Sequence, residues 1–273
     1  MISRYFSEEN FDRWRDDFQF LIKIFKSFRG ELDISLRDNY FNLYFRGNNA
    51  AKVTFKPNEK YRIDIHEKFY PSSLEKDKRF SDTSAGNYRV IETTSELLHP
   101  LLQKNRLDEI YSRIKRENYS EELTFEQMLI TDNLDRDELI LIDRQVTDTK
   151  LKRRMDLLAL KQTQGSQYRF LVLEVKMGNN PELKDKVANQ VSSYINHIDE
   201  NFLAYKSCYE KHYSQKKTMG IITRPDWDTI EIVQGVQGMI VVGGYSVMAK
   251  EQIEILNASF PQLKVLSFEY RIA

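Results

Sequence analysis

The chain has 273 residues and a mass of 32.4 kDa, enough for one large hydrophobic core or two smaller ones. Hydrophobic residues make up 41% of it and charged residues 30%, proportions that exclude wholesale disorder. The 41 basic and 41 acidic residues cancel, so contact with nucleic acid or a membrane would have to depend on local patches.

Cysteine content and the N-terminal segment bear on the compartment. Cys208 is the single cysteine, which excludes an internal disulfide framework and a thiolate zinc cluster. Residues 1–9 lack the apolar stretch of a signal peptide and contain acidic residues. No apolar run is long enough to span a bilayer. We therefore expect a cytoplasmic protein with no membrane partner.

The first third of the chain predicts a helix followed by an antiparallel meander. Large apolar residues recur every three or four positions from Trp14 to Phe28, which predicts one amphipathic helix that Gly30 ends. Four segments with alternating apolar residues then predict strands, at 32–36, 41–45, 53–55 and 61–65. The polar segment 71–86 predicts a linker or long loop. We expect a small α+β domain over residues 1–87 that recognises substrate or a partner, with a structural cap as the alternative.

The remaining residues, 88–273, predict an α/β domain. Residues 95–133 show helical periodicity, and a long helix should follow Pro181, from about residue 182 to 213. A further helix should begin near residue 250. Short continuous apolar runs, typical of buried strands, lie at 139–142, 155–160, 170–173, 219–223 and 239–242, with a last strand at 263–272.

Two of these strands should form a hairpin that brings two carboxylates together. A turn centred on Gly165 would place Asp156 directly opposite Glu174. Opposed residues have Cβ atoms about 4.5–5.5 Å apart, and like charges there repel. A divalent cation such as Mg²⁺ would compensate the repulsion, and Lys176 projects from the same strand face. The alternative is a pair of surface acids with Lys176 as their ion-pair partner.

The helix after this hairpin carries a polar face. Lys186, Gln190 and Tyr194 recur at intervals of four and so share one side of the helix. An apolar stripe, which includes Val191, lies beside them. The polar side can therefore look toward the strand end while the apolar stripe packs on the sheet.

Together, these motifs resemble the PD-(D/E)XK nuclease superfamily. The order is Asp156, then Glu174-Val175-Lys176 on the next strand, then Gln190 to Tyr194 as the Gln-x-x-x-Tyr helix motif of the RecB-like branch. The resemblance covers residues 121–223 approximately. It implies a restriction-endonuclease-like αβββαβ core with a mixed sheet, behind the small N-terminal domain.

The resemblance also implies roles for these residues. Asp156 and Glu174 would hold Mg²⁺ or Mn²⁺, with the carbonyl of Val175 as a further ligand. Lys176 would orient the attacking water or stabilise charge on the phosphate. The two helix residues, Gln190 and Tyr194, would position the metal shell or the nucleic-acid backbone.

Two features of the superfamily pattern leave alternatives here. Its first motif is a glutamate on the helix before the core strands, and Glu126 fits best by its distance from Leu139; the rivals are Glu121, Glu122 and Glu109. The proline of the family name is Met155 here, a position that varies among such families. Two other acids lie nearby: Asp143, which could join the site or pair with Arg144, and Asp148.

The substrate follows from the same chemistry. Basic residues beside the site could contact phosphates, although a solvated basic turn is an equal alternative; they are Lys150, Lys152, Arg153, Arg154, Lys184 and Lys186. The sequence has no zinc-protease, P-loop, dinucleotide or serine-hydrolase motif. We expect a metal-dependent nuclease with DNA rather than RNA as its favoured substrate, which acts in defence against foreign DNA or in DNA repair. The alternative is a non-catalytic protein that keeps the nuclease fold and binds nucleic acid or forms a complex. The sequence is compatible with either a monomer or a homodimer.

Overall fold

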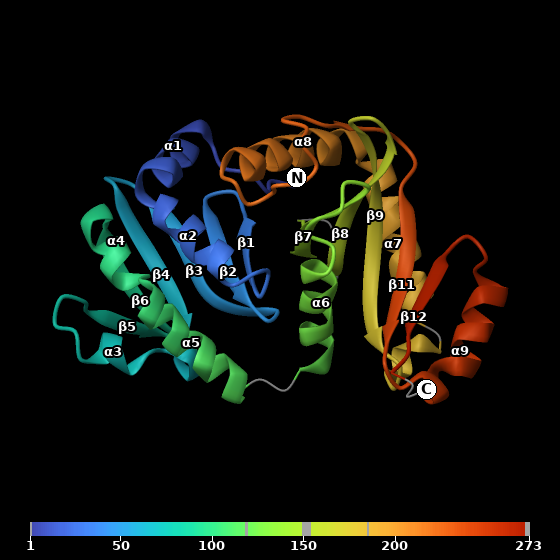
Figure 1. Cartoon of the computed structure of the whole chain (residues 1–273), viewed down its shortest axis with the longest axis horizontal. Helices are drawn as coiled ribbons and strands as arrows, with labels where there is room; N and C mark the ends of the chain where they lie inside the picture. The colour runs from blue at the N-terminus through green and yellow to red at the C-terminus, as the bar shows by residue number, and fades with distance from the viewer. Residues whose placement is uncertain (1, 118–119, 149–153, 185, 271–273) are drawn as a thin grey trace. The chain divides into compact units, whose positions relative to one another are not determined.

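A computed structural model describes residues 2–117, 120–148, 154–184 and 186–270. The chain divides into two compact units (Figure 1). The first comprises Arg4–Ser120 and Gln215–Ile221, and the second chiefly Glu121–Ser214 and Ile222–Ala273. Cys208, the single cysteine of the sequence, is buried in the second unit and forms no disulfide. No helix in the described part of the chain combines the length and the apolar character needed to cross a bilayer.

The first unit contains an antiparallel sheet in the order β1-β2-β3-β4-β6-β5. The expected four-strand meander is confirmed, because β1 to β4 pair in sequence. Its strands are β1 (Leu32–Leu36), β2 (Tyr40–Phe45), β3 (Asn48–Lys56), β4 (Lys60–His66), β5 (Asp82–Ala85) and β6 (Tyr88–Thr94). Side chains alternate between the two faces of the sheet, so every second residue of the central strands points to the same face. These side chains form one apolar core, which includes Phe41, Val53 and Ile63.

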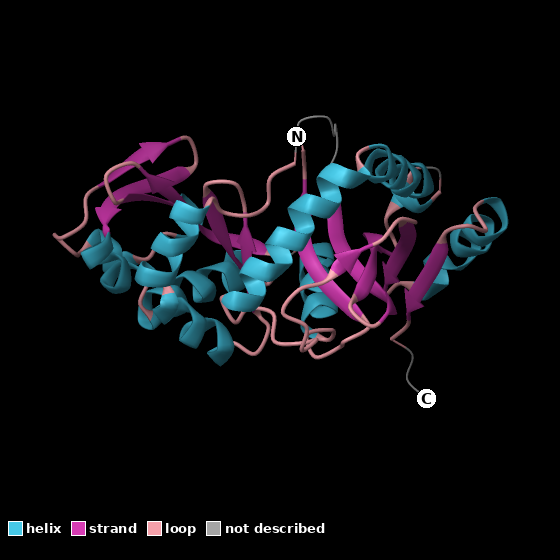
Figure 2. Cartoon of the chain, turned by 90° about the horizontal axis from the view of Figure 1, so that it is seen from above, coloured by secondary structure: helices cyan, strands magenta, loops and turns pink. Residues whose placement is uncertain are grey.

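The helices of this unit bury that apolar side of the sheet and leave its other side without helices of the unit (Figure 2). They are α1 (Glu8–Asp17), α2 (Gln19–Ser27), α3 (Ser72–Glu75), α4 (Ser95–Leu101) and α5 (Lys104–Glu117), with a 3-10 turn at Glu67–Phe69. The prediction of one helix through Trp14 to Phe28 is wrong, because the helix is interrupted at Phe18, which separates α1 from α2. Both pieces face the same core, so the apolar period continues across the break: the Phe18 ring is fully buried, with its centroid 5.0 Å from that of Phe41.

The segment 71–86 is more ordered than its composition suggests. It contains α3, held by buried Leu74, and β5, which pairs with β6 through the backbone while its own side chains stay largely exposed. A strand with an exposed pattern has no apolar period, so the sequence does not reveal it. The sequence places a domain boundary at residue 87, and that boundary stays a prediction. The compact unit described here continues beyond residue 87 to Ser120. It does so because β6 pairs with β4, and α5 buries Leu107 in the same core.

The second unit contains a mixed sheet in the order β12-β11-β9-β8-β7, with the short β10 beside β9. Strands β7, β8 and β9 are antiparallel, whereas β11 and β12 run parallel to β9 and to each other. The strands are β7 (Leu139–Val146), β8 (Met155–Gln164), β9 (Gln167–Met177), β10 (Glu231–Ile232), β11 (Gln237–Gly243) and β12 (Lys264–Phe268). The α/β class, with one antiparallel and one mixed sheet, is therefore confirmed.

Helices cover both faces of this second sheet. Helix α6 (Glu121–Thr131) packs Phe125 and Ile130 on one face, against the Leu157 and Leu173 side of the hairpin. Helices α7 (Val187–Glu200) and α9 (Ser246–Ser259) pack on the other face, and α8 (Phe202–Thr218) follows α7. Because residue pairing in the parallel ladder aligns Glu174 with Ile240 and Lys176 with Val242, both charged side chains lie on the α7 side.

Three sequence expectations for this unit need correction. The helix from 182 to 213 is instead a 3-10 turn (Pro181–Leu183), then α7 and α8, with the break at Asn201, whose side chain bonds the carbonyl of His197. Residues 219–223 form no strand, because Met219 and Ile221 are buried in the core of the first unit. The last strand is shorter than expected among the described residues and ends at Phe268.

Candidate functional site

The hairpin of β8 and β9 has the expected register. Leu157 pairs with Leu173 and Gln162 with Tyr168 about a turn that contains Gly165, which has a left-handed φ of 53°. Asp156 lies one residue beyond the first pair, and its Oδ2 accepts a hydrogen bond from the backbone N–H of Val175 at 2.9 Å. The carboxylate of β8 thus reaches across to β9, beside Glu174 and Lys176 as the sequence predicts.

Lys176 lies among four carboxylates. Its Nζ is 2.9 Å from Glu174 Oε1 and 3.6 Å from Asp156 Oδ2, and 3.9 Å from one oxygen each of Glu122 and Glu182. The lysine side chain is only 6% exposed. Four acids around one ammonium leave an excess of negative charge when all are ionised, which is an arrangement that attracts further cations.

Helix α6 supplies the remaining acids. Carboxylate oxygens of Glu122, Glu126 and Asp156 lie within 4.8 Å of one another. Glu126 is buried and accepts hydrogen bonds from Arg144 at 3.0 Å and from Gln145 at 3.1 Å. Both Glu122 and Glu126 therefore stay as candidates for the first motif.

The other two rivals lie elsewhere. Glu121 accepts a hydrogen bond from the hydroxyl of Tyr245 at 2.9 Å. Glu109 belongs to α5 in the first unit and accepts from the backbone N–H groups of Ser72 and Ser73. Neither side chain belongs to the group of carboxylates formed by Glu122, Glu126 and Asp156.

Two glycines let the helices approach the sheet closely enough to build the site. A Cβ on Gly243 would lie 2.6 Å from the ring of Phe125, and a Cβ on Gly238 would lie 2.5 Å from Val191. Side chains at these positions would push α6 and α7 away from β11. The close approach brings the acids of α6 and the polar face of α7 toward the ends of β8 and β9.

Burial raises the pKa of four of these acids, Glu122, Glu126, Asp156 and Glu174. It raises the pKa of Glu174 to about 8, with help from the charge of Asp156, and that of Glu126 to about 7. The pKa values of Asp156 and Glu122 are raised for the same reason. Burial alone would lower the pKa of Lys176, but the surrounding carboxylates outweigh burial and raise it, so the lysine stays protonated.

Two side-chain oxygens of the predicted site residues lack a hydrogen-bond partner, one on β9 and one on α7. Among the residues that the structure describes, Glu174 Oε2 and Gln190 Oε1 are buried and accept no hydrogen bond. Buried polar atoms are almost always satisfied, and an orphaned acceptor is explained by a missing donor or cation. Both oxygens are hard ligands of the kind that Mg²⁺ and Mn²⁺ prefer.

The other predicted residues of α7 and its surroundings lie as follows. The hydroxyl of buried Tyr194 donates to the carbonyl of Arg154 at 3.1 Å and so attaches α7 to the start of β8. The side chains of Arg154 and Lys186 are exposed and available to a ligand. The role of the Val175 carbonyl as a metal ligand stays a prediction, and Lys150, Lys152 and Arg153 lie outside the described residues.

The two additional acids have different surroundings. Asp143 accepts hydrogen bonds from the backbone N–H of Arg144 at 2.8 Å and from Tyr209 at 3.1 Å. Asp148 contacts His197 at 2.6 Å and accepts from Tyr205 at 3.0 Å. Both carboxylates thus form hydrogen bonds with side chains of α7 or α8.

Sequence reasoning missed the side chains that support the cluster. Arg144 is fully buried and binds Glu126 and Gln127, while Glu182 approaches Lys176 from the segment before α7. Arg144 lies two residues after the apolar run 139–142, and a charged residue so close to a buried strand run is a signal for a buried pair. Nothing in the sequence points to Glu182, which contacts the lysine only because the chain turns back after β9.

The raised pKa of Glu174 predicts how the metal-free protein responds to pH. The folded state binds this proton more tightly than the unfolded state, so the stabilisation is fully present below pH 4.5 and is lost as pH rises through about 8. Glutamine does not titrate. In chelator, the free energy of unfolding of Glu174→Gln should therefore rise relative to that of wild type by about a few kcal/mol as the pH increases from 5 to 9. Melting temperatures of both proteins across this range measure the difference.

A matched control keeps the result specific. Asp135→Asn makes a like change at an exposed position of the same unit and should follow the wild-type curve at every pH. Parallel curves for Glu174→Gln and wild type would contradict a proton held at Glu174.

Comparison with protein-family models, curated proteins and solved structures finds no match for the chain. Its function must therefore be inferred from the arrangement of these side chains.

Proposed function

We propose that the second unit is a metal-dependent phosphodiesterase, a nuclease with DNA as its favoured substrate. The observation that carries the proposal is the convergence of Asp156, Glu174 and Lys176 at adjoining strand ends, with carboxylates of α6 beside them. Three residues that are 20 positions apart at most are expected to meet in a hairpin, but the acids of α6 meet them only through the tertiary fold.

The order of elements supports the restriction-endonuclease-like core as part of this proposal. Helix α6 precedes three antiparallel strands, β7 to β9, and α7 then leads to β11, which runs parallel to β9. With α8 and the short β10 as additions between α7 and β11, this order is compatible with the αβββαβ core that the motifs imply.

The residues fit a hard divalent cation. Asp156, Glu174 and either Glu122 or Glu126 would hold Mg²⁺ or Mn²⁺, and the unpartnered oxygen of Glu174 favours a cation there. A bound divalent cation would supply charge neutralisation at phosphate oxygens and a more acidic water. The protein holds the acids in place, through the Val175 N–H and the Arg144 guanidinium, without needing to rearrange.

The protonation of Lys176 narrows its role. Because the surrounding acids raise its pKa, the ammonium does not act as a general base near neutral pH. It stabilises negative charge instead, first on Glu174 and Asp156 and then on a phosphate that approaches them. Arg154 and Lys186, both exposed, would add contacts with the nucleic-acid backbone.

One observation favours the non-catalytic alternative. The contacts of Lys176 with Glu174 and Asp156 form an ion-pair network that needs no metal to hold it. A protein with such a network could bind nucleic acid or a partner without cleaving it.

An activity assay separates the two candidates. Purified protein is incubated with supercoiled, linear and single-stranded DNA and with RNA, each with Mg²⁺, with Mn²⁺ and with chelator. We expect cleavage of DNA that depends on the metal. Intact substrates in every lane, with binding retained, would favour the non-catalytic protein.

The orphaned amide predicts the effect of a change in α7. Gln190→Ala should lower the cleavage rate by about 10- to 100-fold with little change in melting temperature, because the removed oxygen has no partner within the described structure. Val191→Asp should unfold the unit instead, since it buries a charge under Gly238. Rates and melting curves of both variants are measured together.

Asn196→Ala is the matched control, because it removes an exposed amide from the same helix. It should cleave like wild type. Normal cleavage by Gln190→Ala would mean that the Gln-x-x-x-Tyr motif is coincidental.

A further inference from the structure

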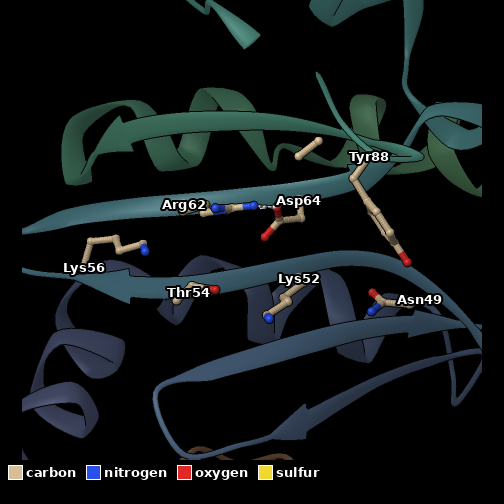
Figure 3. A pocket seen from close by; sticks show the side chains of 8 residues that line it. Asn49, Lys52, Thr54, Lys56, Arg62, Asp64 and Tyr88 are labelled. Carbon is tan, nitrogen blue, oxygen red and sulfur yellow. Dashed lines mark hydrogen bonds and ion pairs between the residues drawn. The ribbon is translucent and has the colours of Figure 1, made fainter. Parts of the chain in front are cut away.

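The side of the first sheet that faces away from its helices is polar. Cross-strand pairing aligns Tyr40 with Thr54 and Arg62, and the next row aligns Lys52 with Asp64. A hollow of about 450 Å³ opens on this surface (Figure 3). Its lining residues are Asn49, Lys52, Thr54, Lys56, Arg62, Asp64, Ala85 and Tyr88. A sheet face with this composition is built for a polar ligand rather than for the core.

The charges in the hollow are unbalanced. Arg62 donates two hydrogen bonds to Asp64, at 2.9 and 2.7 Å, so these two charges compensate each other. Lys52 and Lys56 form no ion pair with an acid in the described part of the chain. Two positive charges therefore remain, spaced about 13 Å apart along one strand with Thr54 between them. Glu92, which faces Arg62 from β6, lies outside this hollow.

An aromatic ring lies beside Lys52, and a second lies at the end of the hollow away from Lys56 (Figure 3). The ammonium of Lys52 lies 4.1 Å from the ring centre of Tyr40. Tyr88 is 43% exposed, and its ring extends into the opposite end of the hollow (Figure 3). At the Tyr88 end of the hollow (Figure 3), Asn49 Oδ1 is buried and accepts no hydrogen bond from the described residues, while the amide nitrogen of Asn49 donates to Asn42. Spaced cations, an exposed ring and an unsatisfied amide are what phosphates, base faces and base edges require.

We propose that this sheet face binds single-stranded nucleic acid. Lys52 and Lys56 contact phosphates, Tyr88 stacks on a base, and the orphaned amide oxygen of Asn49 accepts a hydrogen bond from a base edge. A single strand is the fitting form because its bases are free to stack on a side chain, whereas those of a duplex are already stacked on each other. This binding is a property of the first unit and does not depend on metal or on cleavage by the second.

Binding of the full-length chain to fluorescent oligothymidine and oligouridine in chelator tests the proposal. The double variant Lys52→Ala/Lys56→Ala should bind more weakly, and the slope of log affinity against log salt should shrink by about 1.4. Tyr88→Ala should weaken binding at least about fivefold, and Tyr88→Phe should restore it because the ring face remains. The two oligonucleotides show whether the site distinguishes DNA from RNA.

Lys23→Ala/Lys76→Ala is the matched control, since it removes two exposed lysines from elsewhere on the same unit. This control should bind like wild type with an unchanged salt slope. The proposal would be overturned if both double variants lost affinity for the oligonucleotides to the same extent, or if Tyr88→Ala bound them as tightly as wild type. The proposal would also be overturned if Lys52→Ala/Lys56→Ala weakened the binding of duplex DNA or of anionic lipid vesicles more than the binding of either single strand. Because chelator blocks metal-dependent cleavage, failure here leaves the nuclease proposal for the second unit untouched.

Discussion

Cleavage of DNA should fall at least about 100-fold when Asp156 or Glu174 is replaced by alanine, and to a similar extent in Lys176→Met. The two acids approach the same ammonium, at 3.6 and 2.9 Å, so each change removes a charge from one shared site. Initial rates at saturating Mg²⁺ and at saturating Mn²⁺ measure the loss. Undiminished cleavage by all three variants would place the active site elsewhere.

The structure also shows which variants keep the fold intact. Asp156→Asn retains an oxygen for the Val175 N–H, so it is a milder test than alanine. Lys176→Met fills the volume of the lysine but leaves Glu174 and its neighbours without a cation, and circular dichroism must accompany its rates. Lost activity in a folded Asp156→Asn protein assigns the effect to the chemistry rather than to unfolding.

The same assay identifies the glutamate of α6. Glu122→Gln and Glu126→Gln each change one of the acids near Asp156, whereas Glu121→Gln changes the neighbour that contacts Tyr245. Glu126 is held by Arg144, so a loss of activity confined to Glu122→Gln would assign the first motif to the less constrained acid. Equal, wild-type rates in all three would mean that α6 contributes no ligand.

Local patterns in the sequence determine the hairpin that carries the site. Alternation gives the face of each residue in β8 and β9, and a turn at Gly165 sets the register, so the meeting of Asp156 with β9 is predictable. The antiparallel meander of the first unit is predictable for the same reason. In both cases the partners belong to strands that follow one another in the sequence.

Tertiary packing determines what the sequence does not show. Which glutamate of α6 faces Asp156 depends on how deeply Phe125 settles over Gly243, more than 100 residues away. The break at Phe18 leaves the apolar period intact, so the period cannot reveal it. Met219 and Ile221 are apolar because they enter the core of the first unit, which the sequence pattern does not distinguish from a strand.

Stability should depend on metal in a way that reports the acidic cluster directly. Two carboxylates roughly 5 Å apart repel by about 1–3 kcal/mol at an effective dielectric of 80 to 20. Lys176 offsets part of this repulsion, but it also faces Glu122 and Glu182, so one ammonium does not balance all the acids. In chelator at pH 9, where Glu174 is ionised, Asp156→Asn should therefore melt a few degrees above wild type. Addition of Mg²⁺ or Mn²⁺ should reverse the order, because the metal relieves the repulsion only where both acids remain.

The size of the metal effect follows from ligand linkage. A cation at 100 times its dissociation constant stabilises the folded state by about 2.7 kcal/mol, which raises the melting temperature of wild type by several degrees. Asp156→Asn should barely respond to the same concentration, whereas the exposed control Asp135→Asn should respond like wild type. Differential scanning fluorimetry of the three proteins, with and without metal, provides the comparison. Equal shifts in wild type and Asp156→Asn would mean that Asp156 and Glu174 hold no metal, and the ion-pair network around Lys176 would then be the whole function of the cluster.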